Sequence, residues 1–441
     1  MVDSKDLMIK TLGPCRIDSP LGYLIEGRAQ TFHNVDESDR VLFDDTASAL
    51  AARGGLSAWE LPGFEPAGPR RKIFFDPSKT RAAIVTCGGL CPGLNDVIRA
   101  LTLELYFRYG VRRIHGFCNG YQGFIAKYQR GALDLTPEFV AGINEKGGTI
   151  LGTSRGEQDP GEIVDCLERM NINVLFVIGG DGTIRGAMRV AREIEERGMK
   201  IAVVGIPKTI DNDIMYIDQS FGFQTAFSEA TTSIRAAHVE AEASPNGVGL
   251  VKLMGRHSGF IACYASLAMS DPNFVLIPEV PFQLEGDRGL LNVLQNRLER
   301  RGHAVIVVAE GAGQELMEQS THETDASGNA RLGDIGQFLK HRITEHFARV
   351  NVELNLKYID PSYAIRSVPA NPYDSVYCTR LAHNAVHAAM SGRTEMIVGR
   401  WNARFVHVPM AMAIRASNRV DPNGDLWMSV LESTSQPREF R

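Results

Sequence analysis

Short apolar runs alternate with helix-like segments from about residue 81 onward. Segments with helical spacing of apolar residues, such as 187–197 and 228–242, lie between several of these runs. Five runs are rich in β-branched residues, at positions 82–86, 174–178, 201–206, 248–253 and 304–309. Continuous apolar runs of this length, alternating with amphipathic helices, are typical of strands buried on both faces of a parallel sheet. The pattern predicts a doubly wound α/β fold.

Two segments lie outside this alternation of strands and helices. Residues 1 to about 76 have weak periodicity and several Gly-Pro and Ser-Pro breaks, so we expect an extension wrapped on the body of the protein. Residues 312–332 are polar and predict a long loop.

Composition limits the class of protein. The chain has 441 residues, of which 44% are hydrophobic and 22% charged, so it is long enough for two or three globular domains. The net charge of -5 and the lack of a broad basic cluster argue against nucleic-acid binding. No apolar stretch is long enough for a membrane span, and the N-terminus does not resemble a signal peptide. We therefore expect a cytoplasmic protein without a membrane partner, whose seven scattered cysteines are reduced thiols.

Each predicted strand is followed by a loop that carries glycine or charge. In doubly wound sheets, ligands bind beyond the carboxyl ends of the strands, so these loops are the candidate site. They are C-G-G-L-C-P-G-L-N (87–95), G-G-D-G-T (179–183), P-K-T-I-D-N-D (207–213), M-G-R-H-S-G (254–259) and E-G-A-G (310–313). Any one of them can be a simple turn, but five in equivalent places favour a ligand site.

The residue types in these loops are those that phosphoryl transfer needs. Glycines after a strand let backbone N–H groups approach phosphate oxygens, and Asp181 among them suggests a bridging Mg²⁺. The reaction also needs cations and a base. The loops offer Lys208 and Arg256 as cations and Asp211 or Asp213 as base, and Arg155 is a further candidate cation in the segment 147–155. Neither glycine loop fits the dinucleotide or P-loop fingerprint, which disfavours a dehydrogenase. Periodicity leaves open which loops converge.

Together these strings resemble the motifs of the phosphofructokinase family, in the family's order. Besides four of the loops above they include G-G-T-I-L-G-T-S-R (147–155), A-E-G (309–311) and Y-I-D-P-S-Y-A-I-R (358–366). The resemblance spans about residues 67–392, and the extension and length are similar to the longer-chain branch that includes plant and protist enzymes. It implies an ATP-dependent 6-phosphofructokinase that phosphorylates the C1 hydroxyl of fructose 6-phosphate with Mg²⁺.

The resemblance also implies a role for each site residue. Asp211 is the general base, Thr209, Asp213 and Arg256 are the other catalytic residues, and Asp181 is the metal ligand. The nucleotide is assigned to Gly88, Gly89, Arg155, Gly180, Gly182, Thr183 and Lys208. The sugar phosphate is assigned to Thr209, Asp211, Met254, Gly255, Arg256, Glu310, Lys357, Tyr363 and Arg366. Gly247 and Lys357 stand where the short bacterial enzymes have arginines that reach a neighbouring subunit.

The sequence also leaves alternative functions open and predicts the oligomeric state and the domain boundaries. The resemblance implies that pyrophosphate-using members usually carry Asp at the position of Gly182 and Lys at that of Lys208, whereas short ATP-using members carry Gly at both. This chain is mixed, so pyrophosphate is the alternative donor. A catalytically silent regulatory subunit is a further alternative. We expect a homo-oligomer, a tetramer or a dimer. The expected parts are an extension (1–76), a nucleotide domain (77–222 with 365–415), a sugar-phosphate domain (223–364) and a tail (416–441).

Overall fold

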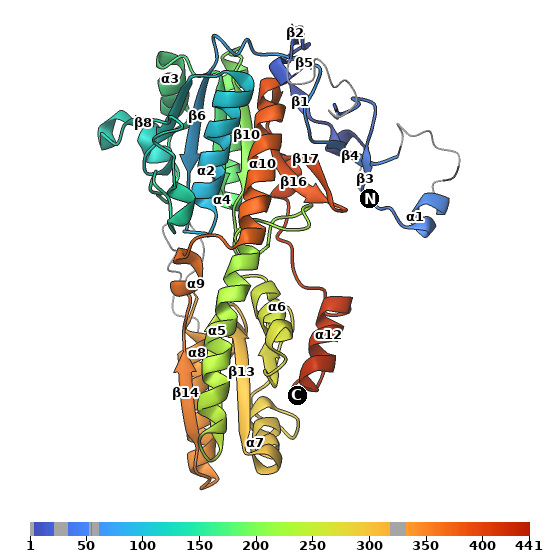
Figure 1. Cartoon of the computed structure of the whole chain (residues 1–441). Helices are drawn as coiled ribbons and strands as arrows, with labels where there is room; N and C mark the ends of the chain where they lie inside the picture. The colour runs from blue at the N-terminus through green and yellow to red at the C-terminus, as the bar shows by residue number, and fades with distance from the viewer. Residues whose placement is uncertain (1–3, 22–33, 53, 55–60, 318–331) are drawn as a thin grey trace. The chain divides into compact units, whose positions relative to one another are not determined.

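The computed structural model describes all residues except 1–3, 22–33, 53, 55–60 and 318–331. The chain forms two compact units (Figure 1). Unit 1 comprises Met1–Thr209, Ile214–Gly222 and Pro369–Ala416, and unit 2 comprises Ile210–Asp213, Phe223–Val368 and Ser417–Arg441.

Unit 1 is built on a nine-stranded mixed sheet. Its strand order is β3 (Val41–Leu42), β4 (Gly63–Pro66), β17 (Arg404–Pro409), β16 (Met396–Trp401), β10 (Ala202–Pro207), β9 (Val174–Gly179), β6 (Arg81–Thr86), β7 (Arg113–Phe117) and β8 (Ala132–Asp134). The strands from β16 to β7 are parallel, and the remaining strands add antiparallel edges. All residues of β9 and β10 are buried, as their continuous apolar runs require.

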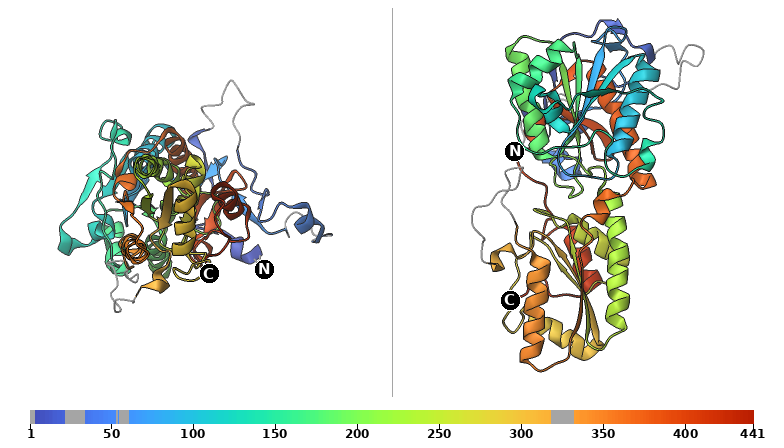
Figure 2. Two further views of the ribbon diagram at one scale, coloured as in Figure 1. Left: turned by 90° about the horizontal axis from the view of Figure 1, so that it is seen from below. Right: turned by 90° about the vertical axis from the view of Figure 1, so that its left-hand side faces the viewer.

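Helices cover both faces of this sheet. In the right-hand view of Figure 2, α4 (green) lies on one face, and α2 (cyan) and α10 (orange) lie on the other. The helices of unit 1 are α1 (Ala47–Ala52), α2 (Leu94–Leu103), which continues as a π-helix (Glu104–Tyr109), α3 (Pro160–Arg169), α4 (Asp181–Glu196), α10 (Pro372–Met390) and α11 (Met410–Ala413). The doubly wound fold is therefore confirmed.

Sequence signals set the starts of several helices. Asp159 caps α3 by accepting from the backbone N–H of Gly161 at 2.7 Å, and Pro160 occupies the first helical position. Asn371 caps α10 in the same way, with Pro372 after it. A cap of this kind satisfies a backbone donor that the helix itself cannot pair.

The N-terminal extension is tied into unit 1. Its β4 pairs with β17, its β1 (Lys10–Thr11) with β15 (Arg393–Thr394), and its β2 (Ile17–Asp18) with β5 (Lys72–Ile73). Glu65 on β4 accepts from Arg70 at 2.8 Å, from Arg393 at 3.0 Å and shares a bond with His407 at 2.9 Å. Two cations and a buried imidazole around one carboxylate hold the pKa of Glu65 below its ordinary value although burial opposes this.

Unit 2 is built on a four-stranded parallel sheet. Its strand order is β12 (Phe274–Leu276), β13 (His303–Ala309), β11 (Gly247–Leu253) and β14 (Asn355–Ile359). α5 (Phe223–Glu242) and α6 (Phe260–Met269) pack on one face, and α7 (Leu290–Arg301) and α8 (Ile335–Arg349) on the other. Figure 2 shows the sheet between α5 and α8. Two more helices, α9 (Ala364–Ser367) and α12 (Asp425–Thr434), belong to this unit.

The five apolar runs are strands, as predicted, and correspond to β6, β9, β10, β11 and β13. The two helices named from the sequence begin earlier than their patterns indicate. α4 begins at Asp181 rather than at residue 187, and α5 begins at Phe223 rather than at residue 228. Glycines 182 and 186 weaken the helical signal of α4, and tertiary packing overrides their low propensity. Of the predicted loop 312–332, residues 318–331 lie outside the described part of the chain.

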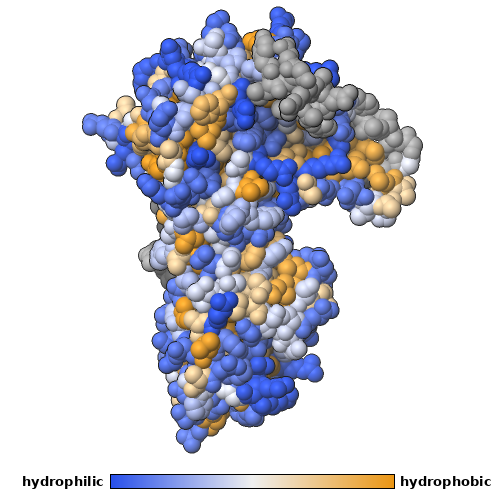
Figure 3. Space-filling model, viewed as in Figure 1, coloured by the Kyte–Doolittle hydropathy of each residue, from blue (hydrophilic) through white to orange (hydrophobic). Residues whose placement is uncertain are grey.

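The surface of the described residues carries scattered apolar side chains. Figure 3 shows hydrophobic patches within a mainly hydrophilic face, some of them over α6 and α12. Met428 on α12 is exposed.

Among the described helices, none combines the length and the hydropathy needed to cross a membrane. All seven cysteines are free, as expected for reduced thiols.

Candidate active site

The glycine loops of unit 1 meet where the strand order reverses. β6 and β9 are neighbours, and Thr86 pairs with Ile178 at their carboxyl ends. The chain continues from β6 to β7 on one side and from β9 to β10 on the other. Loops that leave a parallel sheet in opposite directions open a crevice between them, which is the usual ligand site of this architecture.

The first loop of this crevice is joined to a second segment. Gly88 has a left-handed backbone (φ 85°), and its N–H donates to the carbonyl of Ser154 at 3.2 Å. The hydroxyl of Thr153 donates to the carbonyl of Gly88 at 2.6 Å. Arg155 follows these two residues and is exposed. The structure therefore brings Arg155 to the glycine loop, although 66 residues separate Gly88 from Ser154 in the sequence.

The second loop opens into the N-terminus of α4. Gly180 is the capping position, Asp181 and Gly182 form the first turn, and Thr183 is buried behind them. A Cβ atom built on Gly182 meets no other atom within 4 Å, so packing within the protein does not require glycine there. Exposed N–H groups at a helix N-terminus bind phosphate well. Gly182 leaves room for such a ligand.

Lys208 adds a positive charge to the glycine loops. It follows β10, and its buried side chain donates from Nζ to the carbonyl of Gly89 at 2.7 Å. The same Nζ lies 3.3 Å from where a Cβ on Gly88 would be. Burial raises the pKa of the nearby Cys87 thiol to about 12, so this thiol stays protonated and unreactive. Lys208 is therefore the candidate for charge at these loops, and Cys87 is not a candidate nucleophile.

Asp181 fits a hard divalent cation. Its half-buried carboxylate stands in the first turn of α4, between the glycine positions that suit phosphate oxygens. Mg²⁺ prefers oxygen ligands and is commonly held by one or two carboxylates together with substrate phosphates. The carboxylate of Asp181 therefore suits Mg²⁺.

The segment P-K-T-I-D-N-D is divided between the two units. Residues 207–209 belong to unit 1, and Ile210–Asp213 belong to unit 2. Within unit 2 the hydroxyl of Ser258 donates to the carbonyl of Asp211 at 2.8 Å. The backbone N–H of Asn418 donates to the carbonyl of Asp213 at 2.7 Å. These bonds hold the backbone that carries both candidate carboxylates.

In unit 2 the loops after β11 and β13 lie side by side. The two strands are parallel neighbours that end at the pair Leu253 and Ala309. The backbone N–H of Glu310 donates to the carbonyl of Leu253 at 2.9 Å, and that of Gly311 to Gly255 at 3.1 Å. A Cβ on Gly311 would lie 1.9 Å from the carbonyl oxygen of Arg256, so this close approach requires glycine.

Glu310 stands among cations. Burial raises the pKa of its carboxyl group, while Arg256, Lys252 and Arg366 act in the opposite direction. Arg366 on α9 lies over the ring of Tyr363, 4.8 Å from its centroid. Tyr363 itself is exposed. An acid and two arginines that converge in this way suit a ligand with hydroxyl and phosphate groups.

Sequence reasoning missed the residues that support this cluster. Lys252 forms ion pairs with Asp334 at 3.1 Å and Asp360 at 2.9 Å. Although burial disfavours its charge, the hydrogen bonds that Lys252 donates to these two carboxylates raise its pKa above the ordinary value. In the sequence, Lys252 could have been noticed as the one charged residue inside the apolar run 248–253. Ser258 lies in the candidate loop 254–259, but its bond to the aspartate loop and that of Asn418 gave no recognisable signal, because their partners are backbone carbonyls.

Lys357 lies apart from the loops that carry the other predicted sugar ligands. It is exposed on the edge strand β14, opposite Gly249 in the middle of β11, whereas Met254, Gly255 and Glu310 follow the strand ends. Its part in binding stays a prediction.

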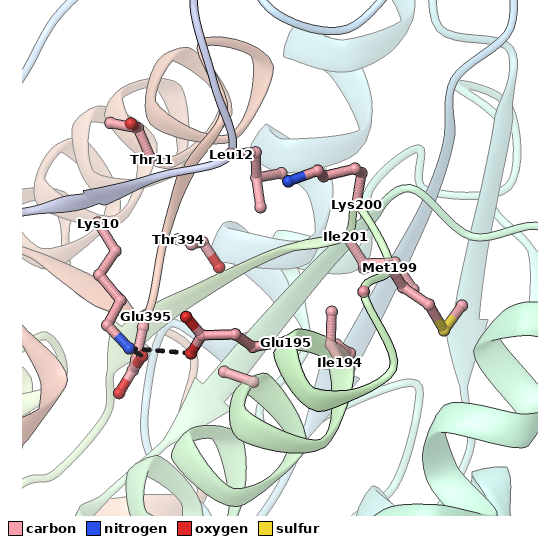
Figure 4. A pocket seen from close by; sticks show the side chains of 12 residues that line it. Lys10, Thr11, Leu12, Ile194, Glu195, Met199, Lys200, Ile201, Thr394 and Glu395 are labelled. Atoms are coloured by element: carbon pink, nitrogen blue, oxygen red, sulfur yellow. Dashed lines mark hydrogen bonds and ion pairs between the residues drawn. The ribbon is translucent and has the colours of Figure 1, made fainter.

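Unit 1 also contains a pocket at the other end of α4. Figure 4 shows Lys10, Glu195 and Glu395 at this cavity, which has a volume of about 260 Å³. Lys10 bonds to Glu395 at 2.6 Å and to Glu195 at 3.2 Å, so the extension closes part of the pocket with its own ion pairs. It lies beside Ile201, just before β10, where ligands of parallel sheets do not usually bind.

Comparison with known proteins identifies the family. The sequence model of the family described as phosphofructokinase matches residues 81–389, which include the glycine loops, the aspartate loop and the loops around Glu310. The chain belongs to the phosphofructokinase family. The resemblance read from its motifs is therefore confirmed.

Relatives and one solved structure extend this finding. An ATP-dependent 6-phosphofructokinase of Amycolatopsis methanolica is 56% identical over 99% of this chain and 96% of its own length. ATP-dependent 6-phosphofructokinase 7 of Arabidopsis thaliana is 52% identical over 85% of this chain and 77% of its own length. The structure of a pyrophosphate-dependent phosphofructokinase from Nitrosospira multiformis superposes with a TM-score of 0.67 at 19% identity, covering 82% of this chain and 93% of that one. At this identity the last comparison supports the fold alone.

Proposed function

We propose that this phosphofructokinase transfers the γ-phosphoryl group of ATP to the C1 hydroxyl of fructose 6-phosphate, giving fructose 1,6-bisphosphate and ADP. Relatives at 49–56% identity over nearly the whole chain are ATP-dependent enzymes, which supports ATP as donor. The structural observation that carries the proposal is the open space at Gly182 in the first turn of α4, next to Gly180, which the backbone of Lys208 approaches. A nucleotide needs this room next to its phosphates, and glycine leaves it.

Unit 1 supplies the groups for the nucleotide. The glycines at 88, 89, 180 and 182 let the backbone approach its phosphates closely. The side chain of Thr183 and the charges of Arg155 and Lys208 bind these phosphates. Asp181 holds Mg²⁺, which when bound neutralises charge on the phosphates. Two observations support these roles. Nζ of Lys208 donates to the carbonyl of Gly89, and the N-terminus of α4 begins at Asp181.

Unit 2 supplies the groups for the sugar phosphate and the base. Asp211 accepts the proton of the C1 hydroxyl as that oxygen attacks the γ-phosphorus. Thr209 of unit 1 and Asp213 orient the reacting groups. Glu310 accepts from sugar hydroxyls, Met254 and Gly255 shape the site, and Arg256 and Arg366 bind phosphate charge, with Tyr363 against Arg366. Lys357 is predicted to add charge at the sugar phosphate, although it lies on the edge strand β14 apart from these loops.

A donor assay tests the proposal. The purified protein should phosphorylate fructose 6-phosphate faster with MgATP than with pyrophosphate, measured by coupled release of fructose 1,6-bisphosphate. Faster turnover with pyrophosphate would establish the alternative donor. No turnover with either donor, in protein that binds the sugar phosphate, would favour the silent regulatory subunit.

Arg366→Ala should raise the KM for fructose 6-phosphate by at least about 10-fold with little change in the KM for ATP, because a neutral side chain does not replace a charge-assisted contact to phosphate. Steady-state kinetics with each substrate varied in turn measures this. Arg380→Ala is the matched control, since Arg380 in unit 1 lies over the ring of Phe405 at 4.6 Å, much as Arg366 lies over Tyr363. Equal effects on both substrates would remove Arg366 from the sugar site.

We also propose a homo-oligomer, a tetramer or a dimer, in the cytoplasm. Exposed apolar side chains support a protein–protein surface on unit 1: Phe107 follows α2, Val376 and Tyr373 are on α10, and these two segments pack together. Such side chains are more often covered in assemblies than left in water.

A further inference from the structure

Two histidines and a glutamate face one another in unit 2. Nε2 of His238 lies 3.5 Å from Oε2 of Glu242, and Nε2 of His303 lies 3.9 Å from Oε1 of the same carboxylate. The three candidate donor atoms all lie within 4.8 Å of one another. Asp271 is a further neighbour, with Oδ1 at 4.0 Å from Nε2 of His238.

The fold places these residues together from three segments. His238 and Glu242 are four residues apart on the last turns of α5, so they share one face of the helix. His303 is the first residue of β13, directly after Gly302, whose left-handed backbone ends α7. Asp271 follows α6. Glu310 follows the other end of β13, so this cluster is separate from the sugar-phosphate residues.

The spacing fits a tetrahedral cation. Metal–nitrogen and metal–oxygen bonds of about 2.1 Å place tetrahedral ligands about 3.4 Å apart. The distance from Nε2 of His238 to Oε2 of Glu242 already matches this value. Nε2 of His303 approaches the other oxygen, Oε1, at 3.9 Å, and Asp271 lies 4.0 Å from Nε2 of His238. Binding of one ion therefore requires small side-chain rotations. The centroids of the two imidazole rings lie 5.6 Å apart, with the rings inclined at 71°, and the candidate donor atoms of both rings lie within 4.8 Å of each other.

The charges and the burial also suit a cation. Among the described residues, the ion-pair partners of Glu242 are these two histidines, so no Lys or Arg competes for its carboxylate. The side chains of His238 and His303 are 21% and 23% exposed, and that of Glu242 is 54% exposed. Two sheltered nitrogen ligands and one solvent-facing carboxylate give an ion a route from water.

We propose that His238, Glu242 and His303 bind a borderline divalent transition-metal ion such as Zn²⁺, with Asp271 or water as fourth ligand. Imidazole nitrogen favours Zn²⁺ over Mg²⁺, which demands oxygen ligands. The ion ties the C-terminal end of α5 to the amino end of β13 and stabilises unit 2. The buried Nδ1 of His238 has no hydrogen-bond partner in the described part of the chain. Because metal-bound histidines gain about 10–100-fold in affinity from such a partner, we expect modest binding.

Zinc titration of the full-length protein tests the site. With millimolar Mg²⁺ present to occupy carboxylate sites, isothermal titration calorimetry should show one Zn²⁺ bound per chain in the unmodified protein. His303→Gln and Glu242→Gln should each weaken this binding by at least about 10-fold, since each removes one of three protein ligands. Zn²⁺ should raise the thermal unfolding midpoint of the unmodified protein, and of neither variant at the same concentration.

A matched control separates this cluster from an ordinary pair. His341 and Glu345 on α8 form an i, i+4 pair at 3.1 Å, and no other histidine belongs to it in the described structure. His341→Gln should bind Zn²⁺ as the unmodified protein does. Unchanged affinity in folded Glu242→Gln, or no binding by the unmodified protein, would overturn the proposal. Since the readouts are binding and stability, failure here leaves the kinase assignment untouched.

Discussion

Asp211→Asn is expected to lower kcat by about 10²–10⁴-fold, which is the usual value of general-base catalysis. The amide has the shape of the carboxylate but cannot accept the C1 hydroxyl proton. Ser258 and Asn418 anchor this loop through backbone carbonyls, so the substitution leaves those bonds in place. The KM values for both substrates should change little, and steady-state kinetics of the folded variant measures this.

Ser258→Ala provides the comparison for Asp211→Asn. It removes one anchor of the loop, while the bond from Asn418 remains. We expect a smaller fall in kcat, because the base is still present and only its position is less well held. If Asp211→Asn retained near-normal kcat, or lost no more than Ser258→Ala, Asp211 would not be the base.

Gly182→Asp is expected to abolish most ATP-dependent activity. Two charges about 5 Å apart repel by about 3 kcal/mol at an effective dielectric constant of about 20. A carboxylate at that distance from the α-phosphate would lower kcat/KM for ATP by about 10²-fold. The variant should fold normally, because a Cβ on Gly182 meets no other atom within 4 Å and its backbone is helical. Pyrophosphate carries no nucleoside, so any activity with it should fall less.

Gly182→Ala separates charge from bulk. A methyl group has room in the protein and bears no charge, so it should retain much more ATP-dependent activity than Gly182→Asp. Circular dichroism and thermal unfolding of both variants check that the fold is kept. Equal loss of ATP-dependent activity in the two variants would contradict electrostatic exclusion of the nucleotide, and wild-type activity in Gly182→Asp would remove this position from the nucleotide site.

The fold class and the candidate loops were readable because they depend on local patterns. Strands buried on both faces need uninterrupted apolar runs, so β6, β9, β10, β11 and β13 stand out in the sequence. Loops that bind phosphate need glycine, so residues 88, 89, 180 and 182 also stand out. The helix starts were less accurate, because Gly182 and Gly186 hide the first turns of α4.

Long-range pairings were decided only by the tertiary structure. The sequence does not encode strand order locally, so it left open that β6 and β9 are neighbours and that their loops share a crevice. It also left open that Lys208 bonds to Gly89, that Lys252 pairs with Asp334 and Asp360, and that the aspartate loop passes from one unit to the other.

The histidine cluster shows most clearly which features the sequence determines and which depend on the tertiary structure. By itself the sequence determined that His238 and Glu242 share a helix face, because their spacing of four is one turn. Only the folded sheet brings His303 to them, since it lies 65 residues from His238 along the chain. Local periodicity specifies elements and their faces. Contacts between distant residues arise from how those faces are buried together, and these contacts assemble the candidate sites of this phosphofructokinase.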